Sequence, residues 1–141
     1  MKAKHSQNPL ILFAEDDDDH YYIGKMALLD TQQNFEVKRV VNGGELIELL
    51  KNAPLLPSLI ILDLNMPKID GRKVLEILHS NHKWKKIPVG VLTTSPNTDD
   101  KTLCLQKGVK LYFQKPSNYS SLVNIMKELL QLIPLSAQEA S

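Results

Sequence analysis

Five short apolar or β-branched runs alternate with segments of helical spacing along this chain, and that alternation limits the possible folds more than any other feature. The runs are LILFA at 10–14, FEVKRV at 35–40, SLIILD at 58–63, PVGVLTT at 88–94 and VKLYF at 109–113. Strands that alternate with helices form βαβ units, so the pattern predicts a parallel sheet with helices on both faces. A chain of 141 residues can bury the core of one such domain.

The composition of each run predicts where its strand lies in the sheet. The runs at 58–63 and 88–94 are nearly continuous in apolar residues, as expected of central strands that are covered on both faces. The runs at 35–40 and 109–113 alternate with polar residues and are expected at the two edges. We therefore expect an α/β doubly wound (βα)5 domain, a flavodoxin-like three-layer sandwich with strand order 2-1-3-4-5.

Helix start and stop signals stand at the junctions between these runs. The expected N-caps are Asp17 or Asp18, Asn42, Asp70, Asn97 or Thr98, and Ser117. Gly108 is expected to close the fourth helix, and Pro134 to end the fifth. These elements predict one domain over 9–133, with an N-terminal extension at 1–8, a C-terminal tail at 134–141 and no output domain.

Charge and cysteine content argue against several classes of partner. The formal net charge is +1, which gives no general attraction to nucleic acid or to an anionic membrane. Cys104 stands alone, which excludes an internal disulfide framework and suits a reducing compartment. The apolar run at 10–14 is too short for a signal peptide or a membrane span. We expect a cytoplasmic protein without a nucleic-acid or membrane partner.

Five consecutive acids, Glu15 to Asp19, follow the first apolar run. They would repel the phosphate of a flavin, which needs an amide-lined cradle at this turn. They do not form a calcium loop of the EF-hand type, because counting from Asp16 places Tyr21 and Ala27 where that loop needs Gly and Glu. An open site for Mg²⁺, held by two or three oxygens with Asp63 as a partner, remains.

The predicted fold brings these acids to one place. Ligands of doubly wound sheets bind beyond the carboxyl ends of the strands, near the switch point between the first and third strands. Glu15 and Asp16 follow the first strand and Asp63 ends the third run, so we expect them to meet there. For Asp17, Asp18 and Asp19 a solvated helix start is favoured, since acids are stabilised at the positive end of the helix dipole.

Four motifs in a fixed order carry a family resemblance. They are AEDD at 14–17, LDLNMPKIDG at 62–71, VLTTS at 91–95 and LYFQKP at 111–116. Together they resemble the receiver domain of two-component response regulators, the family typified by the bacterial chemotaxis regulator, from about Pro9 to Leu132. The segment HSNHKWKKIPVGVLTTS at 79–95 further resembles stand-alone receivers that work with bacterial phytochromes.

The resemblance implies a role for each residue of a phosphoryl-accepting site. Asp63 would be the phosphoacceptor and would attack the phosphorus as a carboxylate nucleophile. Asp16, Asp63 and the main-chain carbonyl of Asn65 would ligate Mg²⁺, with Glu15 acting through a water. Lys115 would contact the phosphoryl oxygens as a second cation, although a lysine before proline is elsewhere a common surface residue.

The resemblance also implies a conformational switch. Thr93 would be the switch hydroxyl, Thr94 would contact the phosphoryl group beside it, and Tyr112 would be the aromatic switch residue. The alternatives are ordinary β-branched residues at a strand end for the threonines and a half-exposed packing residue for Tyr112. In the family the bond before the matching proline is cis, so a cis bond is expected between Lys115 and Pro116.

The resulting hypothesis is a single-domain response regulator. It would accept a phosphoryl group from a phosphohistidine of a sensor histidine kinase or a phosphotransfer protein and switch a face that binds a downstream protein. It would not be an enzyme in its own right, although it would assist its own phosphorylation and dephosphorylation. A homodimer through the face of the fourth and fifth helices is a further hypothesis.

Two alternative functions stay open. The first is a pseudo-receiver, an interaction module that no longer takes phosphate. The second is an aspartyl-phosphate phosphatase of the haloacid dehalogenase type. Such an enzyme needs a second acid two residues after its nucleophile, where this chain has Asn65.

A basic run and the histidines are both expected at the surface of the protein. Lys83, Trp84, Lys85 and Lys86 form a basic-aromatic run. It is either a contact surface, including one for nucleic acid, or a solvated loop. The loop is favoured because the run is short and the chain is nearly neutral. The histidines lack metal-ligand spacing and are expected at the surface: His5, His20, His79 and His82.

Overall fold

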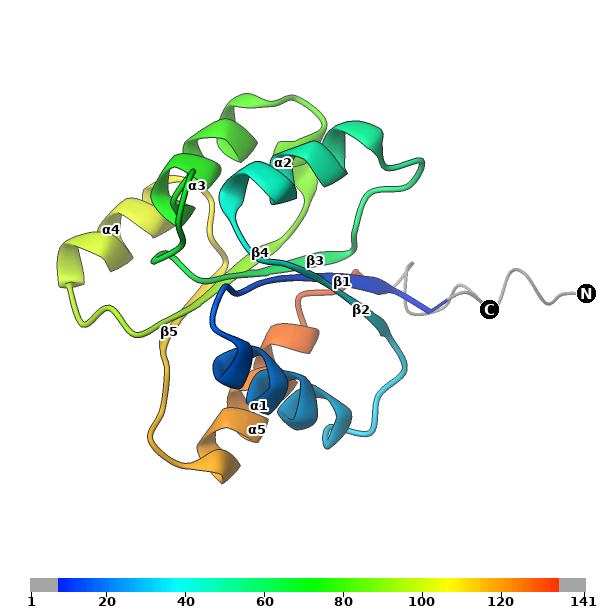
Figure 1. Cartoon of the computed structure of the whole chain (residues 1–141), viewed down its shortest axis with the longest axis vertical. Coiled ribbons are helices and arrows are strands. Elements are labelled where there is room, and N and C mark those ends of the chain that lie inside the picture. The colour runs from blue at the N-terminus through cyan, green and yellow to red at the C-terminus, as the bar shows by residue number, and fades with distance from the viewer. Residues whose placement is uncertain (1–7, 135–141) are drawn as a thin grey trace, which may run out of the picture.

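The computed structural model describes residues 8–134 as a five-stranded parallel sheet between two layers of helices (Figure 1). The strands are β1 (Leu10–Ala14), β2 (Glu36–Val40), β3 (Leu59–Leu62), β4 (Val89–Thr93) and β5 (Leu111–Gln114). Their order in the sheet is β2-β1-β3-β4-β5. The predicted doubly wound fold and its strand order are confirmed.

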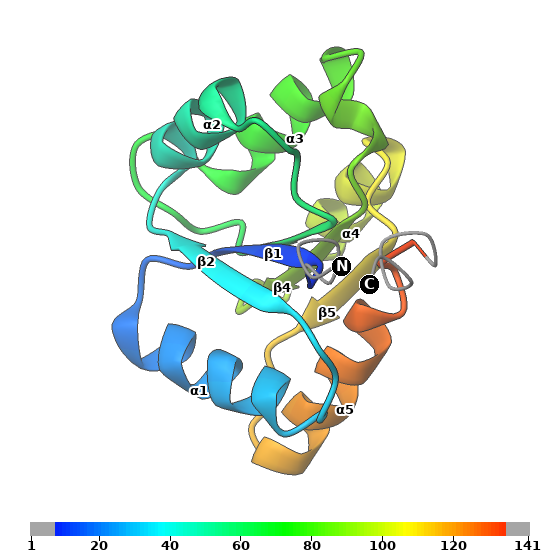
Figure 2. The ribbon, with the colours of Figure 1, turned by 90° about the vertical axis from the view of Figure 1, so that its right-hand side faces the viewer.

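Helices cover both faces of the sheet. They are α1 (Asp18–Leu29), α2 (Gly43–Asn52), α3 (Gly71–Ser80), the short 3-10 helix η2 (Trp84–Lys86), α4 (Thr98–Gln106) and α5 (Tyr119–Leu130). Figure 1 shows α2, α3 and α4 on one face and α1 and α5 on the other. In the view of Figure 2, turned by 90°, α1 and α5 again share one face, where they pack against each other.

Local capping chemistry sets most of the helix starts. Four predicted N-caps accept a hydrogen bond from a backbone amide of the first turn: Asp17, Asn42, Asp70 and Asn97. The predicted cap of the last helix is wrong by one residue. Asn118, rather than Ser117, accepts from the amide of Ser121. This helix ends at Leu130, before Pro134, because tight turns follow it.

The core lies on both faces of the central strands. Successive β1 side chains alternate between the faces, so that Leu12 packs toward α2 and α3 while Phe13 packs toward α1 and α5. The central strands β3 and β4 are buried throughout, whereas β2 and β5 are partly exposed, as predicted for edge strands. The hydrophobic pattern of the sequence thus predicts which strands are buried at the centre of the sheet and which are partly exposed at its edges.

Some expectations concern parts of the chain outside 8–134. Most of the predicted N-terminal extension, nearly all of the predicted C-terminal tail, and His5 lie outside the described residues. Within the described part, no helix combines the length and the apolar character that a membrane crossing requires.

Candidate functional site

The site is built where two neighbouring central strands end. Ala14 of β1 and Leu62 of β3 stand side by side in the sheet, and the ladder continues through a 3.1 Å hydrogen bond from the Asp63 amide to the Ala14 carbonyl. Glu15 and Asp63 therefore leave adjacent strands at the same edge, and both side chains are buried. The predicted position at the carboxyl ends of these strands agrees with the structure.

Asp16 completes an acidic trio. One carboxylate oxygen from each of Glu15, Asp16 and Asp63 lies within 4.8 Å of the others. Burial raises the pKa of the Glu15 carboxyl, and the charge of Asp63 acts in the same direction, while the hydrogen bond from Lys115 opposes both. Asp16 is exposed, so the trio opens to solvent on one side. Such a set of clustered oxygens is suited to a hard divalent cation.

Lys115 directly follows β5, and its side chain reaches the acids of the site. Its Nζ donates to Oε1 of Glu15 at 2.7 Å and to Oδ2 of Asp63 at 3.2 Å. It also lies 2.9 Å from Nδ1 of His20, which must accept because an ammonium has no lone pair. One ammonium cannot neutralise three carboxylates, so negative charge remains for a divalent cation to balance. His20 is exposed, as expected, but the sequence does not predict its contact with Lys115.

The bond between Lys115 and Pro116 corrects one expectation. Residues 8–134 contain no cis peptide bond, so this bond is trans and the predicted cis isomer is wrong. The trans isomer is intrinsically favoured, by about 0.5–1 kcal/mol before proline. The Lys115 amide is held by a 2.7 Å hydrogen bond to the Thr93 carbonyl, and its long side chain reaches the acids from there.

The two threonines lie at the end of β4, beside the acids. Thr93 is fully buried, and its hydroxyl oxygen accepts from the amide of Ser95 at 3.3 Å. Thr94 is exposed, and its hydroxyl oxygen accepts from the side-chain amide of Asn65 at 3.4 Å. The amide of Asn65 in turn donates to Oδ1 of Asp63 at 3.1 Å. The loops after β3 and β4 are therefore linked directly beside Asp63.

Tyr112 lies on the edge strand β5, opposite Val91 of β4. Its ring is half-buried against the core on the α2, α3 and α4 face. The hydroxyl lies 3.5 Å from the carbonyl oxygen of Ser95, and burial raises the pKa of this phenol. The ring is thus next to the β4–α4 loop that follows Thr93 and Thr94.

A bidentate ion pair joins α3 to α4. Arg72 donates from Nε and from a terminal nitrogen to the two carboxylate oxygens of Asp100, both at 2.7 Å. Ser95 adds a 2.7 Å hydrogen bond to the same carboxylate, and the pKa of Asp100 is lowered chiefly by Arg72. The helix that begins after the Asp63 loop is therefore coupled to the loop after Thr93.

Arg39 holds the backbone of the acidic turn from β2. Its Nε donates to the carbonyl of Glu15 at 3.0 Å, and a terminal nitrogen pairs with Asp18 at 2.8 Å. The guanidinium also lies over the ring of Tyr21, 4.7 Å from its centre. These contacts fix the turn that presents Glu15 and Asp16.

Gly71 allows α3 to begin directly against Asp63. A Cβ at this position would lie 2.6 Å from the carbonyl oxygen of Asp63 and 2.6 Å from the Cα of Leu64. Any other residue would therefore push the start of α3 away from the end of β3. The DG pair at 70–71 in the sequence combines this close approach with the N-cap.

Comparison with known sequences now gives the family. The family model of the response regulator receiver domain matches residues 11–127. The response regulator Rcp1 of Synechocystis is 44% identical over 77 residues, which cover 55% of this chain and 52% of Rcp1. The response regulator Rre1 of the same organism is 30% identical over 122 residues, 86% of this chain and 52% of Rre1. The chain spans about half or less of the length of the curated relatives it matches.

Solved structures resemble the whole described domain. The phosphorylated cyanobacterial phytochrome response regulator RcpA is 34% identical, with a TM-score of 0.81 and coverage of 89% of this chain and 94% of RcpA. The Mn²⁺-bound form of Rcp1 is 32% identical, with a TM-score of 0.78 and coverage of 85% and 90%. Both the motifs and the fold therefore lead to one conclusion: this chain belongs to the response regulator receiver family of two-component signalling.

Proposed function

We propose that this protein accepts a phosphoryl group on Asp63 from a phosphohistidine of a sensor histidine kinase or a phosphotransfer protein. One observation carries the proposal: the buried Asp63 carboxylate has oxygens of two further acids within 4.8 Å and the ammonium of Lys115 at 3.2 Å, where β1 and β3 end. In the transfer an oxygen of Asp63 bonds to phosphorus. The bond from phosphorus to the imidazole nitrogen breaks, and that nitrogen keeps the electron pair.

The transfer is proposed to depend on Mg²⁺, for which Glu15, Asp16, Asp63 and the carbonyl of Asn65 are the candidate ligands. The acidic trio supports this assignment, because it carries more negative charge than Lys115 can balance. The solved relative Rcp1 has a Mn²⁺-bound form. A bound divalent ion would supply positive charge that lowers the repulsion between the acceptor carboxylate and the phosphoryl oxygens.

Lys115 is proposed to exchange partners during the reaction. Its ammonium now contacts Glu15, Asp63 and His20, so all three protons are directed at acceptors within the site. A phosphoryl group on Asp63 presents additional anionic oxygens to the same ammonium. Because these contacts strengthen as charge develops on the transferred group, Lys115 favours the phosphorylated product and the route to it.

The switch is proposed to run through Thr93, Thr94 and Tyr112. Thr94 already accepts a hydrogen bond from Asn65, in the loop that follows Asp63. The buried Thr93, one residue earlier, is the last residue of β4. Movement of the Thr93 hydroxyl toward a phosphoryl oxygen would break its bond to Ser95 and free the loop that Tyr112 contacts. Phosphorylation would thereby shift the population between two packings of α4 and β5 and alter a face for a downstream protein.

The donor protein is proposed to dock on α1. Tyr22, Met26 and Leu29 are 60%, 58% and 58% exposed at helical spacing, which gives this helix an apolar outer stripe. Ile23 lines a cavity of about 310 Å³ that also reaches Glu15 and Lys115. A partner that covers this stripe would therefore lie next to the acceptor. A cytoplasmic location and a homodimer through α4 and α5 remain predictions.

The mass of the intact protein tests the phosphorylation proposal. Incubation with Mg²⁺ and acetyl phosphate is expected to add one phosphoryl group to the wild type and none to Asp63→Asn or to the wild type with EDTA. Asp99→Asn, which changes an exposed acid on α4, is the matched control and should react like the wild type. Absence of the adduct, together with absence of beryllofluoride binding, would support a phosphate-independent interaction module instead.

A further inference from the structure

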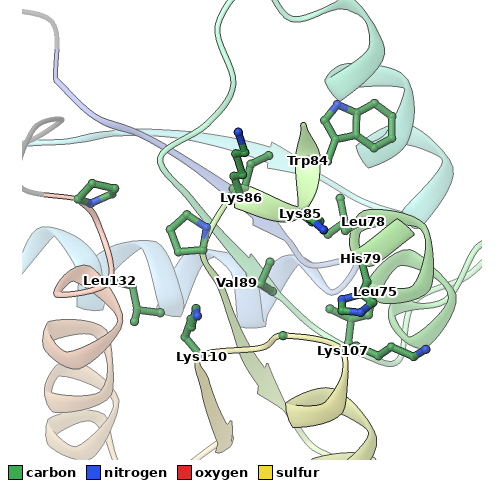
Figure 3. A pocket seen from close by; sticks show the side chains of 14 residues that line it. Leu75, Leu78, His79, Trp84, Lys85, Lys86, Val89, Lys107, Lys110 and Leu132 are labelled. Atoms are coloured by element: carbon green, nitrogen blue, oxygen red, sulfur yellow. The ribbon is translucent and has the colours of Figure 1, made fainter. Parts of the chain in front are cut away.

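A second cavity lies at the end of the sheet opposite to Asp63. It has a volume of about 580 Å³ and is bordered by the end of α3, by η2, by the start of β4 and by the segments around Gly108 and Leu132 (Figure 3). Val89, which lines it, begins β4, whereas Thr93 ends that strand next to the acids. The volume falls within the range of small-molecule sites, roughly 300–1,000 Å³.

The inner surface of this cavity is apolar. Leu75, Leu78, Ile87 and Val89 line it and are buried within the domain. Figure 3 shows Leu132 on one side and the two leucines of α3 on the other. A ligand that enters here would place its own apolar part against aliphatic side chains, and burial of that surface favours binding.

The outer lining of the cavity is basic. Four lysines and one histidine contribute to it, and among residues 8–134 no Asp or Glu lines the cavity: the basic residues are His79, Lys85, Lys86, Lys107 and Lys110. Within the described part of the chain, none of the four ammonium groups forms an ion pair. The chain as a whole carries a formal charge of only +1, so this concentration of positive charge is local.

We propose that this cavity binds a small amphipathic anion, a molecule with a hydrocarbon body and one anionic head group. The aliphatic floor accommodates the body, and the positive charge of the four lining lysines attracts the head. An anion would also relieve the repulsion between these lysines, which have no acidic partner among the described lining residues. The cavity uses none of the residues of the phosphoryl site, so the inference is independent of the proposed function.

The shape of the site argues against a nucleic acid as its occupant. Nucleic-acid surfaces present lysines along a face that can follow a phosphate backbone. Here the lysines surround a hollow whose floor is leucine, isoleucine and valine. Trp84 is half-buried and packs on the core, while Lys85 and Lys86 beside it are exposed. The segment for which a solvated loop is favoured keeps its lysines exposed, but it forms the 3-10 helix η2, and Lys85 and Lys86 line the cavity.

Trp84 allows the proposal to be tested directly, because it is the only tryptophan of the chain and lines the cavity. The full chain would be titrated with decanoate, held below the concentration at which it forms micelles, and in parallel with 1-decanol. We expect a saturable change in tryptophan fluorescence with decanoate and binding of decanol that is about tenfold weaker. Added sodium chloride should weaken binding of decanoate but not of decanol.

Two double variants with the same change in net charge separate a local site from general attraction. Lys107→Glu with Lys110→Glu reverses two charges at the cavity, whereas Lys51→Glu with Lys127→Glu reverses two exposed charges elsewhere. The first pair should weaken decanoate binding by about tenfold, and the second by less than about twofold. Circular dichroism would verify that both variants are folded.

Several outcomes would overturn the proposal. They are equal binding of decanoate and decanol, an equal loss in both double variants, or no binding of decanoate to the wild type. Backbone amide chemical shifts must also change around Leu78, Val89 and Leu132, since changes confined to another surface would place the ligand elsewhere. A dimeric mass by light scattering, lost in the cavity variant and unaffected by decanoate, would assign the cavity to a second copy of the chain.

Discussion

The Nζ of Lys115 lies 2.7 Å from Oε1 of Glu15, although the two residues are 100 positions apart in the chain. This ion pair places a cation inside the acidic trio before any metal or phosphoryl group is considered. Lys115 is only 13% exposed, so the charge is poorly screened by water. Its removal should therefore affect metal binding and phosphoryl transfer in opposite directions.

For Lys115→Ala we expect phosphorylation by acetyl phosphate about 10²-fold slower than in the wild type, because a charged donor to the transferred group is lost. The same variant should bind Mg²⁺ more tightly, since one competing cation is gone. Lys115→Arg keeps the charge but not the compact ammonium and should recover only part of the rate. Calorimetry and time-resolved mass spectrometry measure the two effects. A wild-type rate in the alanine variant would contradict the role of Lys115.

Magnesium should also stabilise the fold. A ligand at 100 times its dissociation constant adds about 2.7 kcal/mol to the free energy of unfolding when it binds only the folded state. Asp16→Asn should lose most of this gain, because it removes one of the three clustered carboxylates. Asp19→Asn, an exposed change on α1, is the control and should retain it. Urea unfolding in MgCl₂ and in EDTA gives the comparison, and an equal gain in both variants would exclude Asp16 as a ligand.

The Arg72–Asp100 pair predicts a specific pH dependence. Arg72 and Ser95 lower the pKa of Asp100 below the ordinary value of 3.8, so the folded state favours the charged carboxylate. The resulting stability is complete above that ordinary value and is lost as pH falls through the lowered pKa. Asp100→Asn should reduce the free energy of unfolding by about 1–3 kcal/mol at neutral pH.

The difference between the wild type and Asp100→Asn should shrink below pH 3.8, where the wild-type carboxylate becomes protonated. Urea unfolding at a series of pH values measures it, with Asp99→Asn as the control for an exposed acid one residue away. A difference that stays constant through this acidic range would show that the charge of Asp100 is not the source of the stability.

The sequence predicted those features that depend on local pattern. Apolar runs separated the buried strands from the edge strands, and capping residues located four helix starts. The fifth start was missed by one residue because Ser117 and Asn118 are both good caps, and only Asn118 reaches the amide of Ser121. The positions of Glu15 and Asp63 followed from the rule that parallel strands end at one edge.

The contacts that the sequence did not predict join residues without any local spacing signal. Arg72 and Asp100 are 28 positions apart, and His20 and Lys115 are 95 apart. Each pair meets only because helices and loops from different βα units pack at the same end of the sheet. The isomer of the bond before Pro116 was inferred from the family rather than from this chain, and there the inference was wrong.

The apolar stripe of α1 should distinguish a protein donor from a small one. Met26→Asp with Leu29→Asp places two charges on exposed positions, so the fold should remain intact. We expect phosphoryl transfer from the cognate kinase to fall at least tenfold, while acetyl phosphate reacts normally, because only the protein donor must cover the stripe. Leu55→Asp with Leu56→Asp, on the segment before β3, is the control. Equal losses with both donors would instead indicate damage to the acceptor site.

Thr93→Ala tests the coupling between the acceptor and the β5 face. The variant keeps Asp63 and the acidic trio, so it should still form the phosphoryl adduct with Mg²⁺ and acetyl phosphate. It lacks the hydroxyl that now holds the amide of Ser95, and so it should lose most of the change that phosphorylation causes around Tyr112. NMR chemical shifts of the Tyr112 ring, with and without beryllofluoride, measure the response.

Thr102→Ala, which changes an exposed threonine on α4, is the matched control and should respond like the wild type. If the ring of Tyr112 responded fully in Thr93→Ala, the signal would have to leave the acceptor by another route, and the direct link from Asn65 to Thr94 would be the next to test.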